Sequence, residues 1–415
     1  MNKKVTFISL LVIIIISVTI CFIFNKKEES KLQNSSNPDF KPFMVDLSSS
    51  INNIIGIPVS TIAKEIEYIP LETKPESLLD EVVKVTLADS FIFVSDVKKL
   101  LQFDRQGRFI RQIGSIGRGP GEYISVSDFS VDNRKEVVYI YSTNSDNMLI
   151  FNFKGDFIKS FMFKGTSIQF EVDSLSRFMF HLINLGKKEG IESYSWLLSD
   201  IDGNIILRIS YSLDLEYKLG RFGSPRSTLY LYNGAFHFME YGIDTLYCLN
   251  NFNKKPYAVF SLGDFKMDSD IQIHSPDDYV KYEKDLWIYD VLEDQNFLYL
   301  TTISGISTNK IRWIFNKQTK ELVVLKDAGF KDDYYGLASF WPKSVYNDSI
   351  LIDYIDAYKL VEILSRKVSG YSAGSVKDFT QKKTYLNENI TETSNPIIMI
   401  ANQQNTIIST DTNEY

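Results

Sequence analysis

The sequence contains few of the residues that form metal clusters and disulfide frameworks. Its 415 residues include only two cysteines and three histidines. Cys21 lies in an apolar run near the N-terminus and Cys248 lies in the strand-like segment DTLYCL, so neither a disulfide framework nor a cysteine metal cluster is available. The net charge is −7, with both signs spread along the chain. We therefore expect no basic surface for nucleic acid.

Motifs for phosphate binding and for two hydrolase classes are also missing. The stretch IGSIGRGPGEY (113–123) is rich in glycine, but a dinucleotide fingerprint requires glycine where Glu122 stands, and a P-loop requires lysine where Pro120 stands. The chain has neither a G-x-S-x-G nucleophile elbow nor repeated sialidase-type boxes. The glycine-rich stretch therefore predicts a turn rather than a phosphate site.

Helical periodicity is nearly absent, and its best candidate, residues 275–284, is short. The chain instead shows apolar or alternating runs of four to eight residues, such as FIFVSD, VVYIYS and FLYLTT, separated by turn residues. Aromatic residues make up 14% of the sequence and alanine is scarce. Short runs rich in β-branched and aromatic residues are typical of strands. The sequence predicts an all-β fold.

A repeat of about 50 residues is visible in the first half of the chain. LLQFDRQGRFIRQI (100–113) is echoed by MLIFNFKGDFIKSF (148–161) and WLLSDIDGNIILRI (196–209), with weaker copies at 247–260 and 313–325. Each of the three clear copies has Asp or Asn followed three residues later by Gly, which suits a hairpin turn with positive φ. This period predicts a β-propeller of four-stranded antiparallel blades. The length favours six blades, although counting alone leaves seven open.

Several segments carry a resemblance to a known family. They are IPLET (69–73), FIFVSD (91–96), FDRQGRFIRQIG (103–114), GRGPGEY (117–123), SDFSVD (127–132), DTLYCL (244–249), FWPKSV (340–345) and NPIIMIA (395–401). With these segments the chain resembles the NHL-like six-bladed β-propeller proteins of Bacteroidota, many of them predicted lipoproteins. The resemblance implies a six-bladed propeller at the cell envelope and implies no particular chemistry. To close such a ring, we expect the strand near 64–70 to pair with the strand near 396–401 in one shared blade.

The N-terminus carries the one long hydrophobic run. Residues 5–24 are uncharged and have two lysines on each side, and their length suits a membrane-spanning helix. An uncleaved anchor is the favoured interpretation, but lipidation at Cys21 and ordinary secretion stay open, because Ile20 weakens the lipoprotein signal without excluding it. We expect a membrane anchor or signal segment at 1–27, a linker at 28–45 and the propeller domain at 46–415.

Five residues are candidate ligand contacts. The glycine-rich turn either only links two blades or lies at a rim where its polar residues face a ligand. The segment YYGLASFWPKS (334–344) either packs between blades or offers aromatic rings to a sugar. The candidates are Arg118, Glu122, Tyr123, Tyr335 and Trp341.

A metal site is not expected. His181, His237 and His274 could converge on zinc, but the first two lie in strand-like runs, where structural histidines are commoner. We predict no metal and no cofactor. The sequence predicts an envelope-anchored, extracytoplasmic binding or interaction module for carbohydrate, peptide or protein. An enzyme on the same scaffold, such as a metal-dependent lyase or a lactonase-type hydrolase, and a scaffold of an envelope complex remain alternatives.

Overall fold

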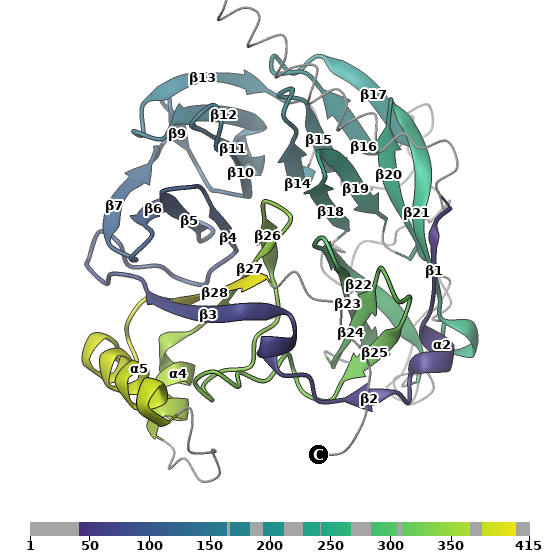
Figure 1. Cartoon of the computed structure of the whole chain (residues 1–415). Helices are drawn as coiled ribbons and strands as arrows, with labels where there is room; N and C mark the ends of the chain where they lie inside the picture. Colours follow the sequence, from purple (N-terminus) through teal and green to yellow (C-terminus); the bar gives the residue numbers. More distant parts are fainter. Residues whose placement is uncertain are drawn as a thin grey trace, which may run out of the picture.

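The described residues form six antiparallel sheets around a central axis (Figure 1). The computed structural model describes residues 41–163, 167–182, 194–210, 227–240, 242–266, 284–304, 309–365 and 376–403. Each sheet has four antiparallel strands, and in five of them the strands follow one another along the chain from the axis outward. The prediction of an all-β six-bladed propeller with four-stranded blades is confirmed. The predicted N-terminal helix lies outside the described residues.

The first three blades carry the clearest copies of the repeat. Blade 1 contains β4 (Lys84–Leu87), β5 (Phe91–Ser95), β6 (Leu100–Asp104) and β7 (Phe109–Ile113). Blade 2 contains β10 (Asp128–Asp132), β11 (Val137–Ser142), β12 (Asn147–Asn152) and β13 (Phe157–Met162). Blade 3 contains β14 (Ser167–Val172), β15 (Phe178–Leu182), β16 (Tyr194–Ser199) and β17 (Ile205–Ser210).

The other three blades complete the ring. Blade 4 contains β18 (Thr228–Tyr232), β19 (Ala235–Met239), β20 (Thr245–Asn250) and β21 (Asn253–Ser261). Blade 5 contains β22 (Leu286–Glu293), β23 (Phe297–Ser304), β24 (Lys310–Asn316) and β25 (Leu322–Leu325). Blade 6 contains β26 (Ser344–Tyr346), β27 (Ile350–Ile355), β28 (Ile397–Gln403) and β3 (Ala63–Pro70). Short 3₁₀ turns lie at Val59–Thr61, Thr143–Ser145 and Gly263–Phe265.

The repeated Asp/Asn and Gly residues form the same turn in the outer hairpins of blades 1 to 3. Gly107, Gly155 and Gly203 have φ values of 82°, 85° and 84°. In blade 1, Asp104 Oδ1 accepts hydrogen bonds from the backbone N–H groups two and four residues later, both at 2.9 Å. Asn152 and Asp200 make the equivalent bonds. The repeat therefore marks one turn type used three times.

The ring closes as expected from the sequence. β3, from the N-terminal part, is the outer strand of blade 6 and pairs antiparallel with β28, with Ile397 opposite Pro70 and Ala401 opposite Ile66. The buried Asn395 side chain adds to this closure, because it accepts a bond from Leu79 N at 2.9 Å and donates to the Ser77 carbonyl at 2.8 Å.

Before it enters blade 6, the chain runs as a strap along two other blades (Figure 1). β1 (Phe43–Asp46) adds a fifth, parallel strand to β21, and β2 (Ile54–Ile55) does the same on β25. The short helix α2 (Leu47–Ser50) lies between them and is capped by Asp46, whose side chain accepts from Ser49 N. β1 begins inside the stretch 28–45 that the sequence assigns to a linker.

Two helices are inserted between β27 and β28 that the sequence interpretation did not anticipate. They are α4 (Ala357–Ser365) and α5 (Val376–Asn389). Leu360 and Leu364 of α4 and Leu386 of α5 are buried in an apolar cluster with Tyr68 of β3. The helices thus cover the outside of blade 6. No helix in the described part of the chain is both long and apolar enough to cross a membrane.

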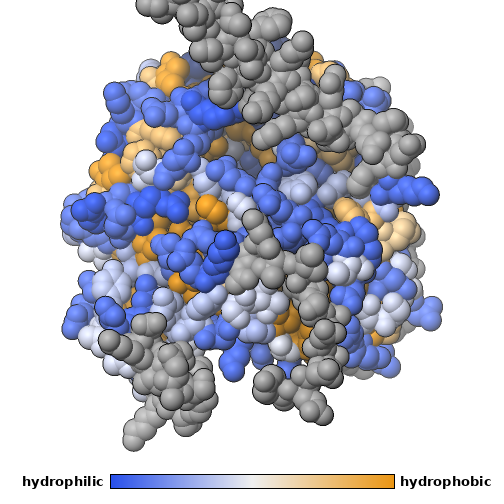
Figure 2. All heavy atoms as spheres, viewed as in Figure 1, coloured by the Kyte–Doolittle hydropathy of each residue, from blue (hydrophilic) through white to orange (hydrophobic). Residues whose placement is uncertain are grey.

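Apolar clusters hold neighbouring blades together. Each of the six interfaces between adjacent blades contains one cluster of buried side chains. Trp196 and Phe238, for example, pack between blades 3 and 4 with ring centroids 5.1 Å apart. A blade buries its faces only against its neighbours, so all six are needed. The face in Figure 2 is largely hydrophilic, with small apolar patches.

Candidate functional site

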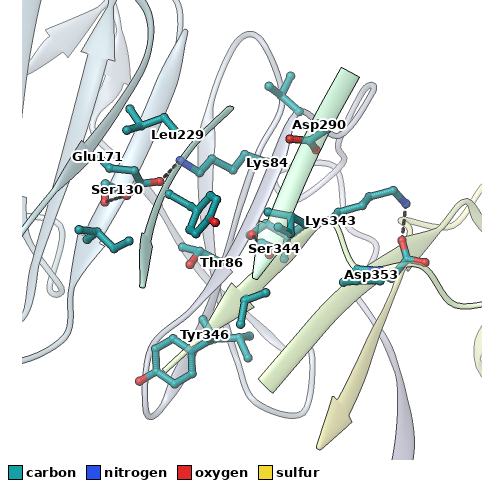
Figure 3. A pocket seen from close by; sticks show the side chains of 18 of the residues that line it. Lys84, Thr86, Ser130, Glu171, Leu229, Asp290, Lys343, Ser344, Tyr346 and Asp353 are labelled. Carbon is teal, nitrogen blue, oxygen red and sulfur yellow. Dashed lines mark hydrogen bonds and ion pairs between the residues drawn. The ribbon is translucent and has the colours of Figure 1, made fainter. Parts of the chain in front are cut away.

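A cavity of about 1590 Å³ runs along the axis of the ring. The inner strands of all six blades line it, and Figure 3 shows side chains from several blades pointing into it. Ligand pockets usually measure about 300–1,000 Å³. This cavity is therefore large enough for an extended ligand.

On blades 1 to 3 the wall carries a closed network of charges. Lys84 Nζ lies 3.0 Å from Asp128 Oδ1 and 3.1 Å from Glu171 Oε1, and Ser130 Oγ donates to the second Glu171 oxygen at 3.0 Å (Figure 3). The second oxygen of Asp128 accepts from Phe170 N at 2.9 Å.

The electrostatics of this network favour a structural role. Burial lowers the pKa of Lys84, but the two carboxylates outweigh it and the pKa is raised. Burial raises the pKa of Glu171 more than Lys84 lowers it. The charged groups are already paired with one another, and their ion pairs link the inner strands β4, β10 and β14.

On blade 5 one row of residues leads outward from the axis. Asp290 of β22 is opposite Thr301 of β23, which is opposite Arg312 of β24. Arg312 Nη1 donates to Thr301 Oγ1 at 3.1 Å, and its Nε donates to the Ala328 carbonyl at 3.4 Å. The row brings a cation from a third strand to the cavity wall, because Asp290, Thr301 and Arg312 all line the cavity.

Blade 6 contributes an aromatic ring and an ion pair beside this row. The Arg312 guanidinium lies over the Trp341 ring, 5.1 Å from its centroid. Trp341 N donates to Asp353 Oδ2 at 2.9 Å, and Lys343 Nζ bonds to the other oxygen of Asp353 (Figure 3). Burial raises the pKa of Asp353, and Lys343 opposes that shift.

Two further polar groups on the wall have no hydrogen-bond partner among the described residues. Thr86 of β4 points into the cavity (Figure 3) and the hydroxyl of Tyr289 on β22 lines it. Lys310 Nζ lies over the Tyr289 ring at 4.7 Å. The wall therefore offers hydroxyl groups without a partner among the described residues, one on blade 1 and one on blade 5 beside Asp290.

A second buried polar cluster lies between blades 4 and 5. Glu293 accepts from the hydroxyls of Tyr230, at 2.9 Å, and Tyr257, and it pairs with Lys317 Nζ at 2.8 Å. The His237 ring stacks on Tyr230. Tyr230 and Glu293 also line the cavity. Because Glu293 is satisfied by these three groups and only 2% exposed, the cluster is a packed part of the wall between two blades.

The five candidate ligand contacts fall in different places. Trp341 lines the cavity. Tyr335 is not among the residues that line it and packs edge-on against Tyr68, with ring centroids 6.2 Å apart. Arg118 is exposed, and Glu122 and Tyr123 belong to the loop between blades 1 and 2, away from the cavity lining. The structure does not bring the two groups of candidates together.

The glycine-rich stretch is a step between two blades, as the turn interpretation predicts. Ser115–Ile116 (β8) pairs with Glu122–Tyr123 (β9), and Glu122 Oε2 accepts from Gly119 N at 2.7 Å. Tyr123 is buried, donates to the Ile113 carbonyl at 2.9 Å, and burial raises its pKa to about 12. A side chain at Gly114, where φ is 67°, would collide with Tyr123.

The histidines are buried in separate blades. His181 and His237 are 6% and 2% exposed, and His274 lies outside the described residues, as does Cys21. Within the described ranges no group of three or more His, Cys, Asp or Glu side chains is placed to hold a metal ion.

Sequence reasoning did not identify Lys84, Arg312 or Asp290. Each lies in an ordinary strand pattern, KVTL, KIRWIFN or LWIYDVLE. Position could have pointed to Lys84 and Asp290, because charged residues on an innermost strand can face the axis of a propeller. Arg312 lies on the third strand of its blade, where position gives no such signal.

Comparisons with known proteins support the fold and leave the activity open. A family model described as "Domain of unknown function (DUF4934)" matches residues 42–402. A Bacteroides fragilis protein whose name describes it as exported has a similar structure, with a TM-score of 0.64 and 17% identity over 88% of this chain and 100% of that chain. This likeness shows a shared fold.

Two other solved structures are more distant. A DUF4221 family member from Bacteroides vulgatus has a TM-score of 0.45 and 12% identity, covering 63% of this chain and 84% of that one. A virginiamycin B lyase from Staphylococcus aureus has a TM-score of 0.37 and 11% identity, covering 64% and 74%. No curated protein matches the sequence.

Proposed function

Since the chain belongs to the DUF4934 family, whose description names no activity, we propose its function from the structure. It is a ligand-binding module at the cell envelope that uses its axial channel as the binding site. The observation that carries this proposal is the cavity of about 1590 Å³ with unsatisfied polar groups on its wall. Cavities with a few convergent polar groups are the usual ligand sites of proteins.

Binding is preferred to catalysis because of how the ionisable groups are used. The densest cluster in the channel, formed by Lys84, Asp128 and Glu171, is engaged in bonds among its own members and with the backbone. A general base or nucleophile needs a free atom directed at a substrate.

A channel-blocking variant tests this proposal. Thr86→Trp places a large ring in the cavity where the native hydroxyl has no partner, and Ser160→Trp places the same ring on the exposed surface of β13 as a control. Fluorescent glycan and peptide arrays would be probed with the full chain in detergent. We expect at least one probe to bind the wild type. That probe should bind Thr86→Trp about tenfold more weakly and Ser160→Trp with the affinity of the wild type. Equal binding by all three proteins would exclude the channel as the site.

The propeller is proposed to lie outside the cytoplasm, held by residues 1–27. Two observations support this placement: the apolar run at 5–24, and the name of the structurally similar Bacteroides fragilis protein, which describes that protein as exported. We expect protease added to spheroplasts to digest the propeller, and Cys21→Ala to leave the protein in the membrane fraction. Incorporation of labelled fatty acid that disappears in Cys21→Ala would show a lipoprotein instead, and full protection from protease would contradict the placement.

A further inference from the structure

Arg312 is a cation on the channel wall without an acidic partner. Within the described part of the chain its hydrogen bonds go only to neutral oxygens, Thr301 Oγ1 and the Ala328 carbonyl, and it forms no ion pair. A guanidinium has five N–H donors. Two of these donors are used within the described residues, so three N–H groups, including both on Nη2, have no partner there.

Three other cations on the wall are already paired with carboxylates. Lys84 is held by two carboxylates, Lys343 by Asp353, and Lys359 by Asp356 at 2.7 Å. To bind one of these three lysines, an anion entering the channel would have to displace a protein carboxylate. To bind Arg312 it would not have to displace one, because Arg312 forms no ion pair among the described residues.

Arg312 attracts an anion more strongly because it is partly buried, although the nearby carboxylate of Asp290 opposes this attraction. It is half-buried, and burial lowers its pKa although the carboxylates of Asp353 and Asp290 raise it. Asp353 is itself neutralised by Lys343. Partial removal from water makes a bidentate bond to a carboxylate stronger than it is at the surface.

The groups around Arg312 suit hydroxyl-rich ligands. Asp290 adds a carboxylate to the wall, which Thr228 Oγ1 approaches at 3.4 Å, and the Thr86 and Tyr289 hydroxyls have no hydrogen-bond partner among the described residues. Tyr289 also presents an aromatic ring on the same wall.

We propose that the channel recognises a carboxylate-bearing oligosaccharide, with Arg312 binding the carboxylate and Asp290 and Tyr289 contacting the sugar ring. This inference rests on the proposed function of the channel as a ligand site. The size of the cavity suits several sugar units better than one.

The test uses calorimetric titration of the full chain in detergent with three probes. These are a short oligogalacturonate, its methyl ester and an oligoglutamate of similar length. The proteins are wild type, Arg312→Gln, Arg312→Lys and, as a control, Arg208→Gln, which removes the same charge from the exposed face of the outer strand β17. Thermal melting checks that each variant is folded.

We expect the oligogalacturonate to bind wild type and Arg208→Gln equally, and to bind both Arg312 variants about tenfold more weakly, since lysine cannot form the planar two-bond contact. The methyl ester should bind wild type about tenfold more weakly than the acid does, as weakly as the acid binds the Arg312 variants. Ester binding equal to that of the acid, tighter binding of oligoglutamate, unchanged affinity in Arg312→Gln, or no oligogalacturonate binding would each overturn the inference.

The two proposals fail in distinguishable ways. If a neutral probe binds and Thr86→Trp blocks it, the channel is a ligand site but carboxylate recognition is wrong. If no probe responds to Thr86→Trp, both proposals are wrong.

Discussion

Deletion of residues 396–415 is expected to abolish cooperative folding. The deletion removes β28, the third strand of blade 6, which pairs with β27 on one side and β3 on the other. Without it β3 has no partner in its sheet, and the ring opens between the first and last parts of the chain.

The free energy contributed by the buried side chains of β28 supports this expectation. Ile397, Ile398, Met399 and Ile400 are at most 1% exposed, and burial of such a side chain contributes about 1.5–3 kcal/mol. Four of them therefore contribute about 6–12 kcal/mol, which is comparable to the whole stability of a typical domain, about 5–15 kcal/mol.

Truncation at two positions provides the measurement. Circular dichroism melts would compare the chain ending at Asn395 with one ending at Gln403, which keeps every described strand. The longer truncation product should melt cooperatively and the shorter one should not. A cooperative native melt of the chain ending at Asn395 would show that closure by β28 is dispensable.

The parts of the fold that follow from local chemistry could be predicted. The hairpin at Asp104 and Gly107 needs only a side-chain oxygen of Asp or Asn and a residue with positive φ within four positions, so its copies are visible in the sequence. Ring closure could be predicted because a propeller needs a partner for its last strands. The pairing of Ile397 with Pro70 lies within the predicted segments.

The strap and the helices are harder to predict because tertiary contacts decide them. β1 and β2 add to outer strands of blades 4 and 5, and nothing in FMVD or II specifies those edges. In α4 the spacing of Ala357, Leu360 and Leu364 is helical, but the segment directly follows the strand run ILIDYI. The strand pattern obscured it.

The candidate site depends on long-range placement. Arg312 meets Trp341 from another blade, and Asp290 and Thr301 lie in its row only because of strand register. No sequence spacing encodes that register directly. The aromatic segment that contains Trp341 was recognised, but the arginine that covers its ring was not.

Replacement of His181 by glutamine is expected to make the protein less sensitive to acid. His181 is 6% exposed, its Nε2 lies 2.9 Å from Ser227 Oγ, and its ring packs on Trp196 with centroids 4.6 Å apart. Burial lowers the pKa of His181 to about 3, against 6.5 for an ordinary histidine.

The direction follows from proton binding. Below pH 6.5 the unfolded chain protonates this histidine while the folded chain does not, so the stability of the native protein falls as the pH falls from about 6.5 to about 3. One group contributes about 1.4 kcal/mol per pH unit in that window, and about 4–5 kcal/mol over all of it.

Urea unfolding of wild type and His181→Gln at pH 7.0, 6.0, 5.0 and 4.5 measures the effect. The variant should be less stable at pH 7.0, since the fit around Ser227 and Trp196 is disturbed. Its disadvantage should then shrink by about 2–3 kcal/mol by pH 4.5, because only the wild type pays the cost of keeping His181 neutral. Buried carboxyl groups such as Asp294, whose pKa burial raises to about 6, are present in both proteins and cancel. Parallel stability curves would show that His181 is protonated in the folded protein or open to water.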